Sequence, residues 1–157
     1  MKINYTYMMR YSVIIPVYNR PDEVDELLQS LTAQHFKDFE VVVVEDGSSV
    51  PCEKIVNQYQ GKLDIHYYNK PNSGPGQTRN YGAERSNGEY LIILDSDCIL
   101  PEGYLDAVEK ELQTAPADAF GGRTGHIVLS PIYKKPLITP WLLSSPREAS
   151  AEAKENG

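Results

Sequence analysis

The stretch YLIILDSD, residues 90–97, is the most informative part of this sequence for predicting its fold. Its first five residues are apolar or aromatic, which is typical of a short strand buried in a parallel sheet. Asp95 and Asp97, one residue apart, follow where the apolar run ends. In open α/β sheets, ligands bind at the carboxyl ends of the strands. The acidic pair therefore marks a candidate ligand site.

A second acidic cluster follows a second apolar run. Residues 41–44 are consecutive valines, and Glu45 and Asp46 come directly after them. Because the carboxyl ends of parallel strands share one edge of a sheet, we expect both clusters to contribute to one site. Two carboxylates one residue apart suit Mg²⁺ or Mn²⁺, which take oxygen ligands and share their coordination shell with phosphates. The pattern predicts a site for a metal-bound nucleotide.

The composition narrows the class of protein. The 157 residues fit one domain, and 41% hydrophobic with 24% charged residues is ordinary for a soluble globular protein. A formal net charge of −7 argues against nucleic acid as a partner, because that partner needs a basic surface. Cys52 and Cys98 are the only cysteines, too few for a secreted disulfide framework, so a reducing compartment is expected.

The N-terminal residues do not resemble a signal peptide. Residues 1–11 are polar and tyrosine-rich and contain no apolar core. No apolar run approaches the roughly 18 residues that a spanning helix needs. We therefore expect a cytoplasmic protein, whose membrane contact is at most peripheral, at the inner face.

Strand and helix patterns alternate along the chain. Strands are predicted at residues 11–17, 40–44, 63–68 and 89–94, helices near 21–31, 51–59, 77–85 and 101–112, and a short strand and turn at 119–122. This alternation predicts an α/β fold with a mainly parallel sheet. Helices should cover both faces, giving a three-layer α/β/α sandwich.

Four motifs carry a family resemblance. They are VIIPVYN at residues 13–19, VEDGS at 44–48, GPGQTRN at 74–80 and LDSD at 94–97, each at a strand end or a helix start. In this order they resemble the nucleotide-binding half of the family 2 glycosyltransferases. The resemblance implies the nucleotide-diphospho-sugar transferase fold and an inverting enzyme. It also implies a nucleotide-diphospho-sugar donor and a divalent cation, Mn²⁺ or Mg²⁺.

The resemblance assigns nucleotide-binding roles to the first three motifs. Pro16, Tyr18 and Asn19 fall where the family lines the base pocket, with the tyrosine ring against the base. Asp46 falls where an acid hydrogen-bonds the base edge, and Arg79 falls near the base and the diphosphate. A tyrosine face stacked on a base contributes about 1–3 kcal/mol.

The fourth motif receives the metal. Asp95 matches the family's contact with the ribose and the metal region, and Asp97 matches the direct metal ligand. Gly74 and Gly76 would let the backbone approach a phosphate, and the helix that follows them favours an anion at its N-terminus. Tyr18 and Asp46 fit a uracil ring, so a UDP-sugar is favoured, with guanine and thymine nucleotides as alternatives.

The resemblance divides the chain at Gly122. Residues 1–10 form an N-terminal extension, residues 11–122 the nucleotide-sugar-binding domain, and residues 123–157 an atypical proline-rich tail. We expect a truncated transferase, and a change of reading frame is one hypothesis for the tail. Such a fragment would expose an unpaired strand edge, through which it could self-associate.

The general base of the transfer reaction is not identified. An inverting transfer needs a carboxylate to accept the proton of the acceptor hydroxyl. In the family this residue lies in the second half of the domain. The acids beyond Gly122 are Glu148, Glu152 and Glu155, and none has the family's context. The catalytic residue therefore stays unassigned.

Three functions follow from these observations. The first is sugar transfer to a glycan or lipid-linked acceptor in cell-envelope polysaccharide or glycolipid synthesis. The second is a non-catalytic module that binds nucleotide and metal, which the missing base favours. The third is a phosphohydrolase of the haloacid dehalogenase type, because Asp95-Ser96-Asp97 superficially resembles its D-x-D-G-T motif. That family carries the motif on its first strand, and Cys98 here replaces the usual glycine.

The histidines and Cys98 receive no catalytic role. His35, His66 and His126 are scattered, and we interpret them as structural or solvent-facing. Cys98 is interpreted as a small core residue.

Overall fold

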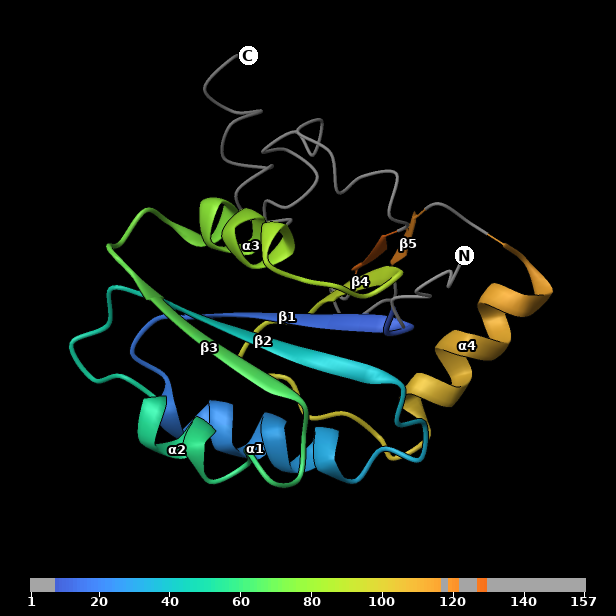
Figure 1. Cartoon of the computed structure of the whole chain (residues 1–157), viewed down its shortest axis with the longest axis horizontal. Coiled ribbons are helices and arrows are strands. Elements are labelled where there is room, and N and C mark those ends of the chain that lie inside the picture. The colour runs from blue at the N-terminus through green and yellow to red at the C-terminus, as the bar shows by residue number, and fades with distance from the viewer. Residues whose placement is uncertain (1–7, 117–118, 122–126, 130–157) are drawn as a thin grey trace, which may run out of the picture.

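The computed structural model of the chain describes residues 8–116, 119–121 and 127–129. Its elements are, in order, β1 (Tyr11–Val17), α1 (Pro21–Thr32), β2 (Phe39–Asp46), α2 (Glu53–Asn57), β3 (Ile65–Lys70), α3 (Pro75–Glu84), β4 (Tyr90–Ile93), α4 (Tyr104–Thr114), β5 (Ala119–Gly121) and β6 (Ile127–Leu129). The strands form one sheet in the order β3-β2-β1-β4-β6-β5. The strands β1 to β4 are parallel, whereas β6 is antiparallel to both β4 and β5. The predicted α/β fold with a mainly parallel sheet is confirmed (Figure 1).

Helices cover both faces of the parallel strands. In Figure 1, α1 and α2 lie below the sheet and α3 lies above it. Successive strand residues alternate between the two layers. Val13 and Val41 belong to the core shared with α1, α2 and α4, whereas Ile14 and Val42 pack with Ala83 of α3. The strands are therefore apolar on both faces, and the predicted three-layer arrangement is confirmed.

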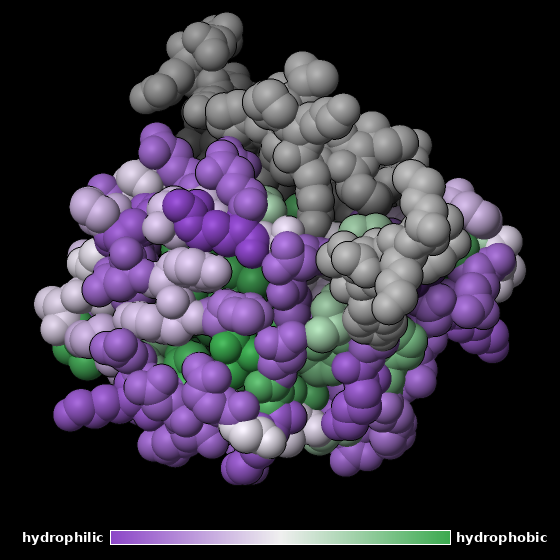
Figure 2. Space-filling view, in the orientation of Figure 1, coloured by the Kyte–Doolittle hydropathy of each residue, from purple (hydrophilic) through white to green (hydrophobic). Residues whose placement is uncertain are grey.

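The surface around β3 differs from the rest of the view. Hydrophilic side chains cover most of the described surface in Figure 2, and strongly hydrophobic atoms show mainly between β3 and the helix layer below it. Side chains of β3 are mostly half-buried, as expected for an edge strand. None of the helices in the described part of the chain is both long enough and apolar enough to cross a membrane.

The helix boundaries differ from the predicted ones by a few residues. Gly74 has φ of 90° and directly precedes Pro75, so α3 begins two residues earlier than predicted. Helix α4 begins at Tyr104, because a turn closed by the Tyr104 N–H and the Pro101 carbonyl comes first. Helix α2 is shorter than predicted and spans Glu53–Asn57.

The sheet extends past Gly122. Strand β6 pairs with β4 through Leu91 and Leu129, Ile92 and Val128, and Ile93 and Ile127. Our sequence analysis predicts no strand there, because three residues are too few to show a periodic pattern. This pairing covers the outer edge of β4 and leaves β3 and β5 as the edge strands of the described sheet.

A buried polar network joins the amino-terminal ends of β1 and β2 to the turn before β4. The Glu40 carboxylate is 2% exposed, and its Oε1 accepts hydrogen bonds from the Ser12 hydroxyl and the Asn87 N–H. The Ser12 hydroxyl accepts a hydrogen bond from the Gly88 N–H at 2.6 Å. A buried carboxylate without hydrogen-bond donors is strongly destabilising, so the folded chain must keep these bonds. They therefore fix β1, β2 and the turn before β4 relative to one another.

Gly88→Ala should destabilise the fold. A Cβ at this position would collide with the backbone of Ser12 and Tyr11, whereas a Cβ at Gly61 would meet nothing within 4 Å. We expect Gly88→Ala to lower the free energy of unfolding by about 1–3 kcal/mol, the usual cost of overpacking. Gly61→Ala, the matched control, should stay within about 0.5 kcal/mol of the parent. Urea unfolding followed by circular dichroism measures both, and equal midpoints for the two variants would contradict this packing.

Candidate functional site

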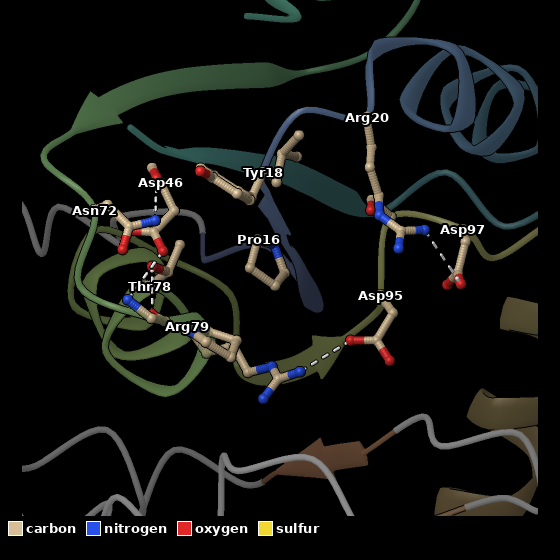
Figure 3. A pocket seen from close by; sticks show the side chains of 13 residues that line it. Pro16, Tyr18, Arg20, Asp46, Asn72, Thr78, Arg79, Asp95 and Asp97 are labelled. Atoms are coloured by element: carbon tan, nitrogen blue, oxygen red, sulfur yellow. Dashed lines mark hydrogen bonds and ion pairs between the residues drawn. The ribbon is translucent and has the colours of Figure 1, made fainter. Parts of the chain in front are cut away.

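A cavity of about 490 Å³ opens at the carboxyl edge of the parallel strands. The ends of β1 and β2, the segment after β4 and the start of α3 form its walls (Figure 3). Six of the seven residues predicted for the site line this cavity, namely Pro16, Tyr18, Asp46, Arg79, Asp95 and Asp97. The two acidic clusters therefore lie at one site. Asn19, the seventh, is not among the lining residues.

The Asp46 carboxylate connects β2, β3 and α3. Its Oδ1 accepts hydrogen bonds from Lys70 Nζ and from the Ser73 N–H at 2.9 Å, and its Oδ2 accepts one from the Gly74 N–H at 3.0 Å. The side chain of Asn72 donates to the backbone carbonyl of Asp46 at 2.9 Å. These bonds order the loop that leads into α3. They also place a negative charge at the positive end of that helix.

These partners control the ionisation of Asp46. Burial by itself would raise the pKa of this carboxyl group. Hydrogen bonds from Lys70, the Ser73 backbone and Thr78 outweigh burial and hold the pKa below its ordinary value. Asp46 is therefore ionised at neutral pH, and it can accept hydrogen bonds but cannot donate one.

Each aspartate of the acidic pair lies beside an arginine. Arg79 of α3 is buried, and its Nη2 donates to Asp95 Oδ1 at 3.0 Å. Arg20, from the loop after β1, places Nη1 3.8 Å from Asp97 Oδ2 and 3.7 Å from Glu23 Oε1. Figure 3 shows both arginines reaching toward the aspartates from opposite sides of the cavity. The hydrogen bond from Arg79 orients the Asp95 carboxylate, whereas Arg20 approaches Asp97 only at ion-pair distance.

Tyr18 and Pro16 provide the apolar part of the cavity. Tyr18 is 54% exposed, so its ring is available to a flat ligand. Pro16, near the end of β1, lies in Figure 3 between Asp46 on one side and Asp95 on the other. The cavity thus has an end with Tyr18 and Asp46 and an opposite end with the acidic pair.

Asn19 organises a neighbouring loop. Its backbone has φ of 53°, its N–H donates to the Ser48 hydroxyl at 2.8 Å, and its side-chain Oδ1 accepts from the Val50 N–H at 2.9 Å. The Ser48 hydroxyl in turn donates to the buried carboxylate of Glu45. Asn19 therefore joins the loop after β1 to the loop after β2 and sets the backbone next to Tyr18. Its role in the base pocket stays a prediction.

Several polar or charged residues of this region are not predicted from the sequence. Arg20, Asn72 and Thr78 line the cavity, and Lys70 bonds Asp46 behind it. Arg20 follows the motif at residues 13–19, Thr78 lies within the motif at 74–80, and Lys70 is the last residue of β3. Lys70 could have been found from the register, because it is the residue of β3 that pairs with Asp46.

The surroundings of Cys98 favour the protonated thiol. Burial, together with the carboxylates of Asp95 and Asp97, raises its pKa to about 11. The thiol therefore stays protonated at neutral pH, and the thiolate is the reactive and metal-binding form.

The acidic pair fits a divalent cation. The side chains of Asp95 and Asp97 are 52% and 61% exposed, and both offer hard oxygen ligands to the cavity. Within the described residues, no third histidine, cysteine or acidic side chain joins them at ligand distance. The remaining ligands would therefore come from phosphate and water, which is how Mg²⁺ usually binds beside nucleotides.

Comparison with known proteins identifies the family. The model of "Glycosyl transferase family 2" matches residues 12–154. This chain belongs to glycosyltransferase family 2. Membership of this family decides against the phosphohydrolase alternative, and the acidic pair indeed follows the fourth strand, not the first.

The solved structures of two other glycosyltransferases share this fold. TarS 1-349 of S. aureus in complex with UDP-GlcNAc matches with a TM-score of 0.67 and 36% identity, over 71% of this chain and 33% of TarS 1-349. The mannosyltransferase PcManGT from Pyrobaculum calidifontis, in complex with GDP-Man and Mn²⁺, matches with a TM-score of 0.65 and 26% identity, over 73% of this chain and 35% of that protein.

A curated relative matches at the level of sequence. The GalNAc(5)-diNAcBac-PP-undecaprenol beta-1,3-glucosyltransferase of Campylobacter jejuni is 32% identical over 117 residues, which is 73% of this family 2 chain and 38% of the relative. The chain thus spans well under half the length of the proteins that it matches here.

Asp46→Asn should alter the pH dependence of stability. Because the pKa of Asp46 is lower in the folded chain, its stabilising effect is complete above about pH 3.8, the ordinary value, and is lost as pH falls through the folded-state value. At pH 7 the substitution should lower the free energy of unfolding by about 1–3 kcal/mol, since the amide is uncharged and offers only one acceptor oxygen to the three donors around the carboxylate. This difference should shrink below about pH 4.

The control for this measurement is Glu26→Gln, at an exposed position of α1. It should leave the free energy of unfolding within about 0.5 kcal/mol of the parent at every pH. If the penalty of Asp46→Asn were the same at pH 7 and pH 3, the account of Asp46 would be wrong.

Proposed function

We propose that this chain binds the donor in a reaction that transfers a sugar from a nucleotide-diphospho-sugar, with a UDP-sugar favoured, to a glycan or lipid-linked acceptor. The observation that carries the proposal is the cavity at which Tyr18, Arg79 and the acidic pair meet. Family membership supports it, as do the structures of S. aureus TarS 1-349 in complex with UDP-GlcNAc and with UDP.

The two ends of the cavity suit the two ends of a nucleotide. The base would stack on the exposed ring of Tyr18, with the ionised carboxylate of Asp46 facing the base edge. The ribose and the diphosphate would then extend past Pro16 toward Asp95 and Asp97, along the direction seen in Figure 3. A uracil ring fits this arrangement, because its ring N–H can donate to a carboxylate.

The charges at the cavity favour a cation with the nucleotide. Among the described residues, two arginines and three aspartates line it, so these side chains together carry one excess negative charge. A nucleoside diphosphate adds further negative charge. A divalent cation held by Asp97 and Asp95 would offset this charge, and Mn²⁺ or Mg²⁺ are the candidates.

The residues of the chain would stabilise the departing nucleotide. A cation held by Asp97 and Asp95 would supply Lewis-acid stabilisation of the charge that forms on the diphosphate as the sugar leaves. Arg79 is held in place by Asp95 and needs little reorganisation to act on the same charge. Arg20 is half-exposed at the opposite wall, and the diphosphate would compete with Asp97 for its guanidinium.

A second candidate is a module that binds the donor without transferring the sugar. The carboxylates that line the cavity among the described residues favour it, because those of Asp46, Asp95 and Asp97 all have a role toward the base or the cation in this proposal. None of them is left to accept the proton of an acceptor hydroxyl. Incubation of the chain with UDP-GlcNAc separates the two candidates. A ribitol-phosphate polymer and a polyprenol-linked glycan serve as acceptors. Acceptor-dependent release of UDP supports transfer, whereas binding without release supports the module.

We also propose a location at the membrane surface and self-association between copies of this chain. The name of the Campylobacter relative includes a lipid-linked acceptor. An acceptor of this kind would bring the chain to the inner face of the membrane as a peripheral protein. Self-association would use an edge strand, for which β3 is a described candidate because its side chains are mostly half-buried.

Tyr18→Ala should weaken nucleotide binding through loss of stacking. We expect the affinity for UDP to fall by about 1–3 kcal/mol, whereas Tyr18→Phe should retain most of it. Val50→Ala is the matched control, since Val50 is similarly exposed but does not line the cavity. Calorimetric titration with UDP in the presence of Mn²⁺ measures all three. Equal losses for Tyr18→Ala and Tyr18→Phe would rule out stacking.

Asp97→Ala should abolish the gain in UDP affinity that Mn²⁺ provides, because it removes a ligand of the cation. The fold should persist, since the side chain is 61% exposed. Glu84→Ala, at a side chain that is 72% exposed and outside the cavity, should keep the full response to Mn²⁺. Titrations with and without Mn²⁺ measure the response, and an unchanged response in Asp97→Ala would remove this residue from the metal site.

A further inference from the structure

A second group of possible metal ligands lies at the opposite edge of the sheet. Glu40 belongs to β2, His66 belongs to β3, and Asp64 directly precedes β3. Their ligand atoms all lie within 4.8 Å of one another, and in the described part of the chain they form the only group of three or more such side chains. This group is at the amino-terminal ends of the strands, whereas the nucleotide cavity is at their carboxyl ends.

The parallel pairing of β2 and β3 brings the three residues together. Val42 pairs with His66, and the Val41 N–H donates to the Asp64 carbonyl at 2.8 Å. Because residues two apart in a strand share a face, Asp64 and His66 project on the same side, next to Glu40. The backbone therefore holds all three in fixed positions.

Both carboxylates face one nitrogen of His66. The distance from His66 Nε2 is 3.1 Å to Asp64 Oδ1 and 3.5 Å to Glu40 Oε2. A ring nitrogen carries at most one hydrogen, so it can make one good hydrogen bond but not two. A metal ion in place of that hydrogen could contact all three ligand atoms. Metal–ligand bonds of about 2.1 Å at a tetrahedral Zn²⁺ place the ligand atoms about 3.4 Å apart, close to both distances.

Glu40 gives the site a buried carboxylate, one oxygen of which is directed at His66. Its Oε1 already accepts from Ser12 and Asn87, whereas its Oε2 is directed at His66. The side chain is 98% buried, and its Oε2 accepts no hydrogen bond from the described residues beyond the approach of His66. His66 and Asp64 are 43% and 46% exposed, so an ion could enter from solvent.

We propose that Glu40, Asp64 and His66 form a divalent-metal site for Zn²⁺, separate from the nucleotide cavity. One imidazole nitrogen and two carboxylate oxygens are a ligand set that zinc accepts, with the fourth position open to water. The bound ion would join β2 to β3. Through the bonds of Glu40 it would also join them to β1 and to the turn before β4.

His35 is the matched control for this site. It also lies between two acids, but Glu102 approaches its Nε2 and Asp106 its Nδ1, each at 3.7 Å. The two nitrogens of an imidazole point in different directions, so these acids cannot share one ion with a single nitrogen. The His35 group should therefore bind no zinc, although its composition is the same.

The test is calorimetric titration of the metal-free chain, without a polyhistidine tag, with zinc chloride, together with thermal melts. We expect one site with a higher zinc affinity than the acidic pair of the nucleotide cavity, and a melting temperature that rises with zinc concentration, since an ion that binds only the folded chain stabilises it. Loss of a residue that merely orients a ligand costs about ten- to a hundredfold in metal affinity. Loss of the ligand itself, in His66→Ala or Asp64→Asn, should cost at least about a hundredfold.

Two further variants locate the ion. His35→Ala and Asp97→Asn should keep the zinc affinity and the melting response, because neither touches this group. Circular dichroism of the zinc-free variants shows whether each is folded. Absence of zinc binding in the parent chain would overturn the proposal and leave only the direct contacts between His66 and its two acids. Zinc binding that survives His66→Ala would overturn it as well, because the ion would then lie elsewhere.

Discussion

The cavity depends on one buried carboxylate, that of Asp46 at the end of β2. A buried charge is costly unless donors surround it, and here the donors are Lys70 and the backbone N–H groups of Ser73 and Gly74. The chain can supply them only by folding the loop after β3 back over the end of β2. That loop closes so tightly that a Cβ at Gly47 would collide with Asn72. The start of α3, and with it Arg79, is therefore positioned by Asp46.

Most of the fold could be predicted from the sequence, because its strands are buried on both faces. The valines of β2 and the apolar run of β4 have no polar alternation, and only a parallel sheet covered by two helix layers buries such runs. The boundaries of helices were less predictable, since they depend on single turns such as the one from Pro101 to Tyr104. Strand β6 could not be predicted, because its three residues belong to the sheet only through pairing with β4.

The sequence was informative about the site where a residue's type matches its place at a strand end. Six predicted residues line one cavity for this reason. The role of Asn19 in the base pocket stays a prediction. The structure shows its backbone at φ of 53° and its amide oxygen bonded to the Val50 N–H, contacts that follow from the folded loops and not from its place in the motif. Lys70 and Arg20 were missed because their roles depend on which charges the folded chain places beside them.

We propose that the cavity binds a uridine nucleotide together with a divalent cation. Calorimetric titration of the unmodified chain with UDP, with and without Mn²⁺, tests it most directly, and a circular dichroism melt of the same sample establishes that the chain is folded. We predict one site whose affinity for UDP rises clearly when Mn²⁺ is present. A folded chain that binds no UDP in either condition, or that binds it equally in both, would contradict this account.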